Sequence, residues 1–247
     1  MIVGPDRIVA CPHCKGLARC TSLVSGNNYG ARLWTDGRYV APWLPASPQV
    51  VRCRRCSEIY WLADAERVGN LDPLASEDSV DPAWRAAEAV QEPSEQEYYL
   101  AIEKRLAGDA DQERTLRVAA WRKHNDAVRR DPPATPSDAV SEVDGWRGNL
   151  EALASLLDDQ DENHRPLKAE MLRGLGRFEA ATAVLDSVTS PKCEPLVSQP
   201  IRISGRVVGA SMVPRVGRRG RNPGESGVFG AGAGCGWVLK GAASAGR

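Results

Sequence analysis

Short apolar runs with a period near two dominate the first 68 residues and predict a β-rich segment. Residues 7–10 and 50–52 each hold adjacent β-branched side chains, and residues 59–62 add an aromatic run. Such side chains favour strands because they pack well on a pleated surface. The pattern therefore predicts strands at these three places.

A hairpin is predicted in the middle of this segment. Asp36-Gly37 separates residues 31–34 from residues 38–40, which carry aromatic and β-branched side chains. Glycine readily adopts the positive φ of a tight turn, so Asp-Gly between two such runs is a good hairpin signal. Prolines then recur every three residues from Pro42 to Pro48, and an irregular crossing is expected there because proline lacks an amide donor.

The apolar period changes to about 3.6 after Pro93, which predicts helices. Residues 94–97 read as a capping box before the first helix, and Gly108 suits its end. A second helix is expected over 112–130, where Asn125 falls among the apolar positions and a proline-rich stretch follows. Further helices are predicted near residues 146–157, 165–175 and 178–188, and their short connections favour antiparallel packing.

The formal charge of zero conceals two oppositely charged segments. Residues 1–199 carry 24 Lys and Arg against 31 Asp and Glu, whereas residues 200–247 carry 8 against 1. Residues 200–247 also contain 12 glycines and show no sustained apolar period. Ordering so much glycine costs entropy that few apolar side chains offset, so we expect a disordered tail.

Two Cys-x-x-Cys pairs next to predicted strands carry the candidate chemistry. Four thiolates complete a tetrahedral shell around Zn²⁺ and leave no open position for a substrate, so such a site is structural. The 38 residues between the pairs exceed a minimal ribbon, and the predicted hairpin accounts for them. The sequence thus predicts one structural zinc ion, bound by Cys11, Cys14, Cys53 and Cys56.

The other cysteines and a redox role fit this pattern less well. A redox Cys-x-x-Cys pair commonly sits at a helix N-terminus, and neither pair here precedes a predicted helix. A thiol-dependent redox enzyme therefore stays the weaker alternative. Cys20 is expected to be a small buried side chain, His13 to face solvent, and Cys193 and Cys235 to have no partner.

Nucleic-acid binding by the ribbon is a second alternative. Arg52, Arg54 and Arg55 cluster near the second pair, and six aromatic residues lie between positions 29 and 61. Aromatic side chains among cations are typical of surfaces that bind single strands. Because residues 1–199 are net acidic, we favour instead an aromatic core with solvated arginines.

Signatures of enzymes and of membrane insertion are absent from the sequence. We find no His-Glu-x-x-His, Gly-x-Ser-x-Gly or phosphate-loop motif, so no catalytic residue and no organic cofactor is predicted. No apolar run approaches the ~20 residues that cross a bilayer, and the first ten residues do not read as a signal peptide. A protein without membrane association, in the reducing cytoplasm, is expected.

Residues 165–188 resemble a tetratricopeptide-repeat hairpin. Residues 176–181, Gly-Arg-Phe-Glu-Ala-Ala, match the family's turn signature of Gly-x-aromatic-x-x-Ala. Ala169, Leu172 and Leu185 fit small and apolar positions of its two helices, whereas Lys168 stands where an apolar residue is usual. The resemblance implies a helical surface that binds a protein partner, with an ordinary helical hairpin as the alternative.

The chain as a whole resembles a family of uncharacterised bacterial proteins with an N-terminal zinc ribbon and a tetratricopeptide-like helical region. The cysteine pairs, residues 25–27, residues 34–37 and residues 172–181 carry this resemblance. In that family the helices would continue past residue 198. A basic tail that contacts RNA and an out-of-frame reading of a GC-rich gene are two interpretations of the change in composition.

Together these patterns predict an α+β protein. It would consist of a zinc-ribbon-like β domain over residues 1–68, a linker with a short helix around 83–90 over residues 69–94, an α-helical domain over residues 95–190 and a disordered basic tail over residues 191–247. Its expected function is that of a non-enzymatic zinc-binding scaffold or adaptor whose helices bind an unidentified protein partner.

Overall fold

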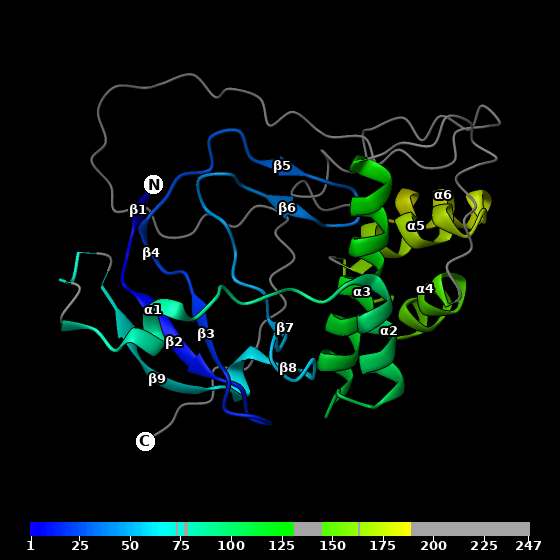
Figure 1. Ribbon diagram of the computed structural model, residues 1–247. Coiled ribbons are helices and arrows are strands. Elements are labelled where there is room, and N and C mark those ends of the chain that lie inside the picture. Colours follow the sequence, from blue (N-terminus) through cyan, green and yellow to red (C-terminus); the bar gives the residue numbers. More distant parts are fainter. Residues whose placement is uncertain (73, 77–78, 131–144, 163, 189–247) are drawn as a thin grey trace, which may run out of the picture. The chain divides into compact units, whose positions relative to one another are not determined.

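The computed structural model describes residues 1–72, 74–76, 79–130, 145–162 and 164–188, and Figure 1 shows their helices and strands. The fold is α+β, as predicted, with small antiparallel sheets and six α-helices in the described part of the chain. The described residues form two compact units. The first is Met1–Ala31 with Val40–Gly108, and the second is Arg32–Tyr39 with the described residues from Asp109 onward. The predicted tail over 191–247 lies outside the described residues.

A three-stranded antiparallel sheet forms the framework of the first unit. Its central strand β2 (Asp6–Ala10) pairs with β3 (Leu17–Cys20) on one side and with β9 (Glu66–Leu71) on the other. Ile8 is fully buried in this strand. The sequence predicted β2, but β3 has no β-branched or aromatic residue and β9 has only Val68, so neither carries the side chains that are typical of strands.

Two smaller sheets complete the strands of this unit. β7 (Val50–Arg52) pairs with β8 (Ile59–Trp61), which confirms both predicted strands. β1 (Ile2–Val3) pairs with β4 (Leu23–Ser25), and neither of these was predicted. Sheets of two or three strands have little core, so a unit built from them needs another source of stability.

The helix predicted over residues 83–90 is wrong in its second half. Asp81 caps α1 (Pro82–Ala86), since its carboxylate accepts the amide of Ala83, and the helix ends after five residues. The chain then runs extended and pairs with two strands. Arg19 of β3 donates its amide to Glu88 and accepts that of Val90, and the amide of Arg52 in β7 donates to Gln91. Tertiary pairing has overridden the helix propensity of the alanines here.

α2 (Glu95–Glu103) begins with the predicted capping box. The Ser94 hydroxyl accepts the amide of Glu97, and the Glu97 carboxylate accepts the amide of Ser94 at 2.8 Å. Two amides that have no partner within the helix are thereby satisfied. Tyr98 and Ala101 form its buried face.

Ser94→Ala should lower the free energy of unfolding by about 1 kcal/mol, because the Glu97 amide loses its acceptor. Urea unfolding of the full chain measures this change. Ser76 is exposed outside any helix, so Ser76→Ala controls for the loss of a serine hydroxyl. An equal effect of the two substitutions would contradict the capping role of Ser94.

The second unit contains the predicted hairpin and the last four helices. β5 (Arg32–Leu33) and β6 (Tyr39–Val40) flank the turn, where the Gly37 amide donates to Trp34 and φ of Gly37 is +71°. A positive φ is the reason for glycine at this position. The hairpin predicted from Asp36-Gly37 is therefore confirmed.

The four helices of this unit lie close to their predicted positions. They are α3 (Ala110–Arg130), α4 (Trp146–Ser155), α5 (His164–Gly174) and α6 (Phe178–Asp186). Their common core is apolar, with side chains from α3, α4, α5 and the turns that follow α4 and α5. Its buried members are Val118, Trp121, Leu150, Leu153, Leu157, Leu167, Met171 and Leu175.

Candidate metal centre

The first cysteine pair lies in a tight turn between β2 and β3. The Cys11 amide donates to the Gly16 carbonyl at 2.9 Å, and the Lys15 amide donates to the Cys11 carbonyl at 3.0 Å. The Gly16 amide also approaches the Cys14 sulfur at 3.4 Å. This turn, residues 11–16, is the first knuckle.

The second knuckle, residues 53–58 between β7 and β8, repeats the same pattern. The Cys53 amide donates to the Glu58 carbonyl at 2.8 Å, and the Ser57 amide donates to the Cys53 carbonyl at 2.9 Å. Ser57 and Lys15 occupy equivalent positions and both have a positive φ, +63° and +59°. Two unrelated sequences thus form the same turn, and each turn directs both of its sulfurs to one side.

The four sulfurs converge on one point. The Sγ atoms of Cys11 and Cys56 are 3.8 Å apart, those of Cys14 and Cys53 are 3.6 Å apart, and all four lie within 4.8 Å of one another. A tetrahedron with Zn–S bonds of about 2.3 Å has edges of about 3.8 Å. The four cysteines are free thiols, far beyond the ~2.05 Å of a disulfide bond. Their geometry therefore fits one tetrahedral metal ion.

The cluster is closed on its inner side by apolar packing. Cys11 and Cys53 are buried, whereas Cys14 and Cys56 are partly exposed. Val51 and Tyr60 belong to the same buried cluster, and Leu62, Ala65 and Val90 pack against it. Thiolate ligands in an apolar pocket are typical of structural zinc, since the shell excludes water from the metal.

The thiols differ in their affinity for protons. Burial is the largest single influence on Cys53 and raises its pKa, but hydrogen bonds from the amides of Cys56 and Arg55 and from the thiols of Cys56 and Cys14 together lower that pKa to about 7. Burial raises the pKa of Cys11 above its usual value. Because Zn²⁺ binds thiolates, a metal ion here would displace the protons that the more basic thiols hold.

The other candidate residues lie apart from the cluster. Among the described residues, no other group of three or more potential ligands comes close enough together to hold a metal ion. Cys20 is a buried side chain with 1% exposure, as predicted, and His13 is exposed. Cys193 and Cys235 fall outside the described residues. Neither knuckle opens a helix, because β3 and β8 follow them.

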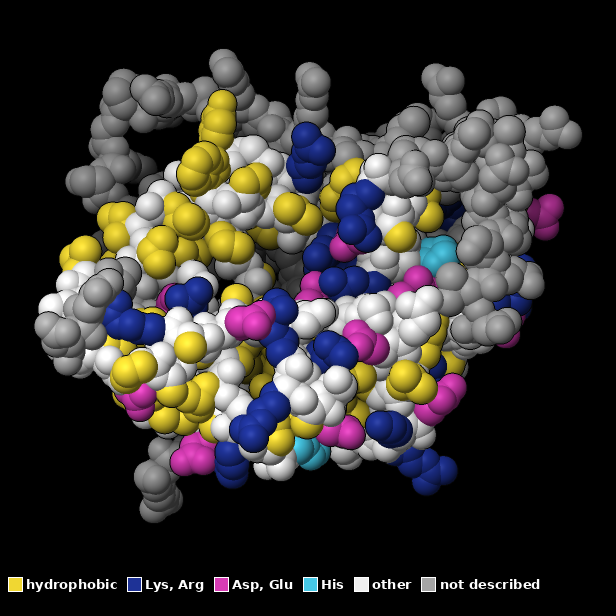
Figure 2. Space-filling view, viewed as in Figure 1, with side chains coloured by type: hydrophobic (Ala, Val, Ile, Leu, Met, Phe, Trp, Pro, Cys, Tyr) yellow, Lys and Arg dark blue, Asp and Glu magenta, His cyan; other side chains and the backbone are white. Residues whose placement is uncertain are grey.

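Two of the three arginines near the second knuckle form ion pairs, and the predicted aromatic core is incomplete, because Tyr29, Tyr39 and Trp43 are exposed. Arg52 approaches the Glu97 carboxylate at 2.6 Å, and Arg54 pairs with Glu88 at 2.8 Å. Tyr60 is buried, and Trp61 donates its indole N–H to the Leu106 carbonyl. On the face drawn in Figure 2, basic side chains are interspersed with acidic ones.

A buried carboxylate in the hairpin was not foreseen from the sequence. Asp36 has no solvent exposure and accepts three hydrogen bonds. Its Oδ1 accepts the Arg38 amide at 3.0 Å, and its Oδ2 accepts both Asn125 Nδ2 and Arg129 Nη2 at 2.7 Å. Asn125 among the apolar positions of α3 was the one sequence signal of this contact.

Two further contacts fix the hairpin on α3. Arg122 donates to the carbonyls of Asp36 and Gly37 at 3.2 and 2.8 Å. The Arg129 guanidinium lies 4.2 Å from the centre of the Trp34 ring, a cation–π distance. We call Asp36 with Arg122, Asn125 and Arg129 the hairpin clamp.

Comparison with known proteins adds no relative to this picture. No protein-family model, curated protein or solved structure matches this chain. Within the described residues, no helix is both long and apolar enough to span a lipid bilayer.

Proposed function

We propose that this protein is a non-enzymatic scaffold in which one structural zinc ion stabilises the first unit and the helical unit binds a protein partner. The convergence of four cysteine sulfurs from two like knuckles carries the proposal. A Cys₄ shell has no open coordination position, so it supplies folding free energy and no Lewis-acid catalysis.

The small sheets of the first unit support the need for a metal ion. The two knuckles connect β2 to β3 and β7 to β8, so one ion bound to both would join two separate sheets. Binding free energy would then appear as folding free energy, because the ligand set exists only in the folded chain. Zinc thus supplies the stability that the core of this unit lacks.

The α5–α6 hairpin supports the proposed interaction role. φ of Gly176 is +75° in its turn, and the Arg177 amide donates to the Leu172 carbonyl to close the end of α5. Ala169 and Ala181, the small residues of the tetratricopeptide resemblance, are both buried. Phe178 at the start of α6 remains 44% exposed and offers an apolar side chain to a partner.

Phe178→Ser should weaken capture of a protein partner by the full chain, because it removes an exposed apolar anchor. The measurement is quantitative co-purification from the native host under reducing conditions, with cross-links mapped onto the chain. Leu74→Ser is the matched control, since Leu74 is a 92% exposed apolar residue of the first unit.

A partner that cross-links to α5 or α6 and is lost with Phe178→Ser alone supports the proposal. Equal capture by both variants argues against an interaction through the helical hairpin. Recovery of RNA or DNA in place of protein, with binding that weakens steeply as salt rises, would favour the nucleic-acid alternative.

A further inference from the structure

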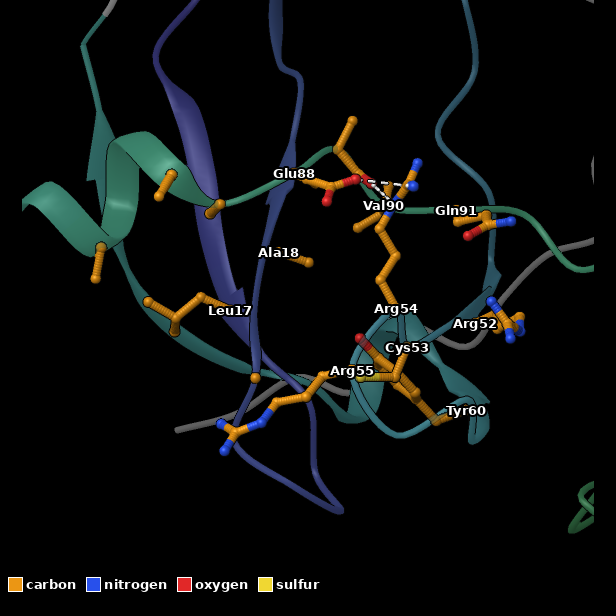
Figure 3. A pocket seen from close by; sticks show the side chains of 15 residues that line it. Leu17, Ala18, Arg52, Cys53, Arg54, Arg55, Tyr60, Glu88, Val90 and Gln91 are labelled. Carbon is orange, nitrogen blue, oxygen red and sulfur yellow. Dashed lines mark hydrogen bonds and ion pairs between the residues drawn. The ribbon is translucent and has the colours of Figure 1, made fainter.

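A pocket of about 430 Å³ lies beside the second knuckle, entirely within the first unit. Its walls come from β3, from the second knuckle and from residues 83–91, and Figure 3 shows the side chains that line it. Pockets that hold small molecules usually measure about 300–1,000 Å³ and combine apolar walls with a few polar groups. The size alone therefore permits a small organic ligand.

One wall of the pocket is apolar and nearly free of large side chains. Five of its residues are alanines, from β3, α1 and the extended segment after α1: Ala18, Ala83, Ala86, Ala87 and Ala89. Leu17 also lines this side of the pocket, whereas Val90 lies beside Arg54 (Figure 3). Alanine methyl groups leave space that a larger side chain would fill. A flat apolar part of a ligand can therefore pack against this wall.

The opposite wall is basic. Arg52, Arg54 and Arg55 line the pocket, with Glu88 as the one acidic residue among the lining side chains. Arg54 is held in place by two contacts, its Nη1 with the Glu88 carboxylate at 2.8 Å and its Nε with the Ala89 carbonyl at 3.3 Å. Arg52 pairs at 2.6 Å with Glu97, which lies outside the lining, so Arg55 alone of the three arginines has no carboxylate partner among the described residues.

Arg55 is the arginine that remains available to a ligand. It is exposed, and it forms no ion pair with any residue that the structure describes. Its stem crosses Gly16 so closely that a Cβ there would lie 3.2 Å from Arg55 Cβ and Cδ. The first knuckle therefore supports the Arg55 stem, while its guanidinium stays open to solvent.

We propose that this pocket binds a nucleoside monophosphate, with the heteroaromatic base against the alanine wall and the phosphate on Arg55. A guanidinium binds phosphate oxygens in a fork of two hydrogen bonds. A phosphate monoester offers three strong acceptor oxygens to such a fork, whereas a carboxylate offers two. Binding of this ligand would be a function in addition to the proposed scaffold role. It depends on the metal centre only because the metal ion holds the two knuckles in place.

Calorimetric titration of the zinc-loaded full chain with AMP tests the proposal. Adenosine and inorganic phosphate serve as the two partial ligands. AMP should bind at least about tenfold more tightly than either, because charged hydrogen bonds and the apolar wall both contribute. Arg55→Ala should weaken AMP binding about tenfold. Ala18→Leu and Ala86→Leu should weaken it comparably by filling the apolar side of the pocket.

Controls separate ligand binding from folding and from the metal centre. Arg67 on β9 bonds to Asn70 outside the pocket, so Arg67→Ala should bind AMP like the unaltered chain. Zinc content and circular dichroism are measured for every variant. If a variant has lost its zinc, a weaker affinity for AMP reports damage to the metal centre and does not test the contacts in the pocket.

Absence of AMP binding to the zinc-loaded chain would overturn the proposal. So would equal affinity for AMP and adenosine, or AMP binding that none of the three pocket substitutions changes. Stronger binding of a short single-stranded oligonucleotide than of AMP would also overturn it, in favour of a strand-binding surface. Loss of affinity in the pocket variants alone, with zinc retained, supports it.

Discussion

Replacing Cys53 with Ser should abolish stable zinc binding and unfold the strands of the first unit. A serine hydroxyl is a poor ligand beside three thiolates, and Cys53 is the buried member of the second knuckle. Structural zinc in small domains contributes about 10–16 kcal/mol of apparent binding free energy at pH 7. That exceeds or equals the whole stability of most domains, about 5–15 kcal/mol, so β structure should disappear with the metal.

Metal analysis and far-ultraviolet circular dichroism of reducing-purified protein measure this outcome. Cys20→Ala is the matched control, because Cys20 is as buried as Cys53 but lies outside the cluster. The control should keep one zinc per chain and lose only packing free energy. A Cys53→Ser chain that keeps its zinc and its strands would contradict a four-cysteine site.

Asp36→Ala should lower the free energy of unfolding of the full chain by about 3–5 kcal/mol, the usual cost of breaking a buried ion pair. The substitution leaves the Arg129 guanidinium, which is only 11% exposed, without its carboxylate on the hairpin side. Asn125 Nδ2 also loses its acceptor. Arg129 still pairs with Asp126 at 2.7 Å, which places the effect near the lower end of the range.

Urea unfolding, followed by tryptophan fluorescence to which Trp34 and Trp121 contribute, measures this change. Asp159→Ala is the control, since Asp159 pairs with Lys168 from a largely exposed position. An exposed ion pair contributes at most about 1 kcal/mol, so the control should change stability little. If Asp36→Ala costs no more than Asp159→Ala, the hairpin clamp is not a source of stability.

The parts of the fold that depend on contacts between residues close in sequence could be predicted from local sequence patterns. The Asp36-Gly37 turn, the Ser94 capping box and the helices after Pro93 all follow from residues within a few positions of each other. The metal centre could be predicted for a similar reason. Each Cys-x-x-Cys pair forms its own turn, and the chemistry of zinc indicates that two such turns meet.

Contacts between distant residues explain what the sequence did not reveal. Asp36 meets Asn125 and Arg129 across 89 and 93 positions, and its Asp-Gly context suggested only a turn. The segment after α1 is rich in alanine and reads as helix, yet its pairing with Arg19 and Arg52 holds it extended. That pairing also creates the alanine wall of the pocket. The pocket therefore could not be predicted from the spacing of apolar residues along the chain.

X-ray absorption spectroscopy at the zinc edge, together with metal analysis of the reducing-purified full chain, tests the central claim most directly. We expect one zinc per chain with four sulfur neighbours at about 2.3 Å and no nitrogen or oxygen in the shell. A chain that contains no zinc, or a shell with fewer than four sulfurs, would contradict it.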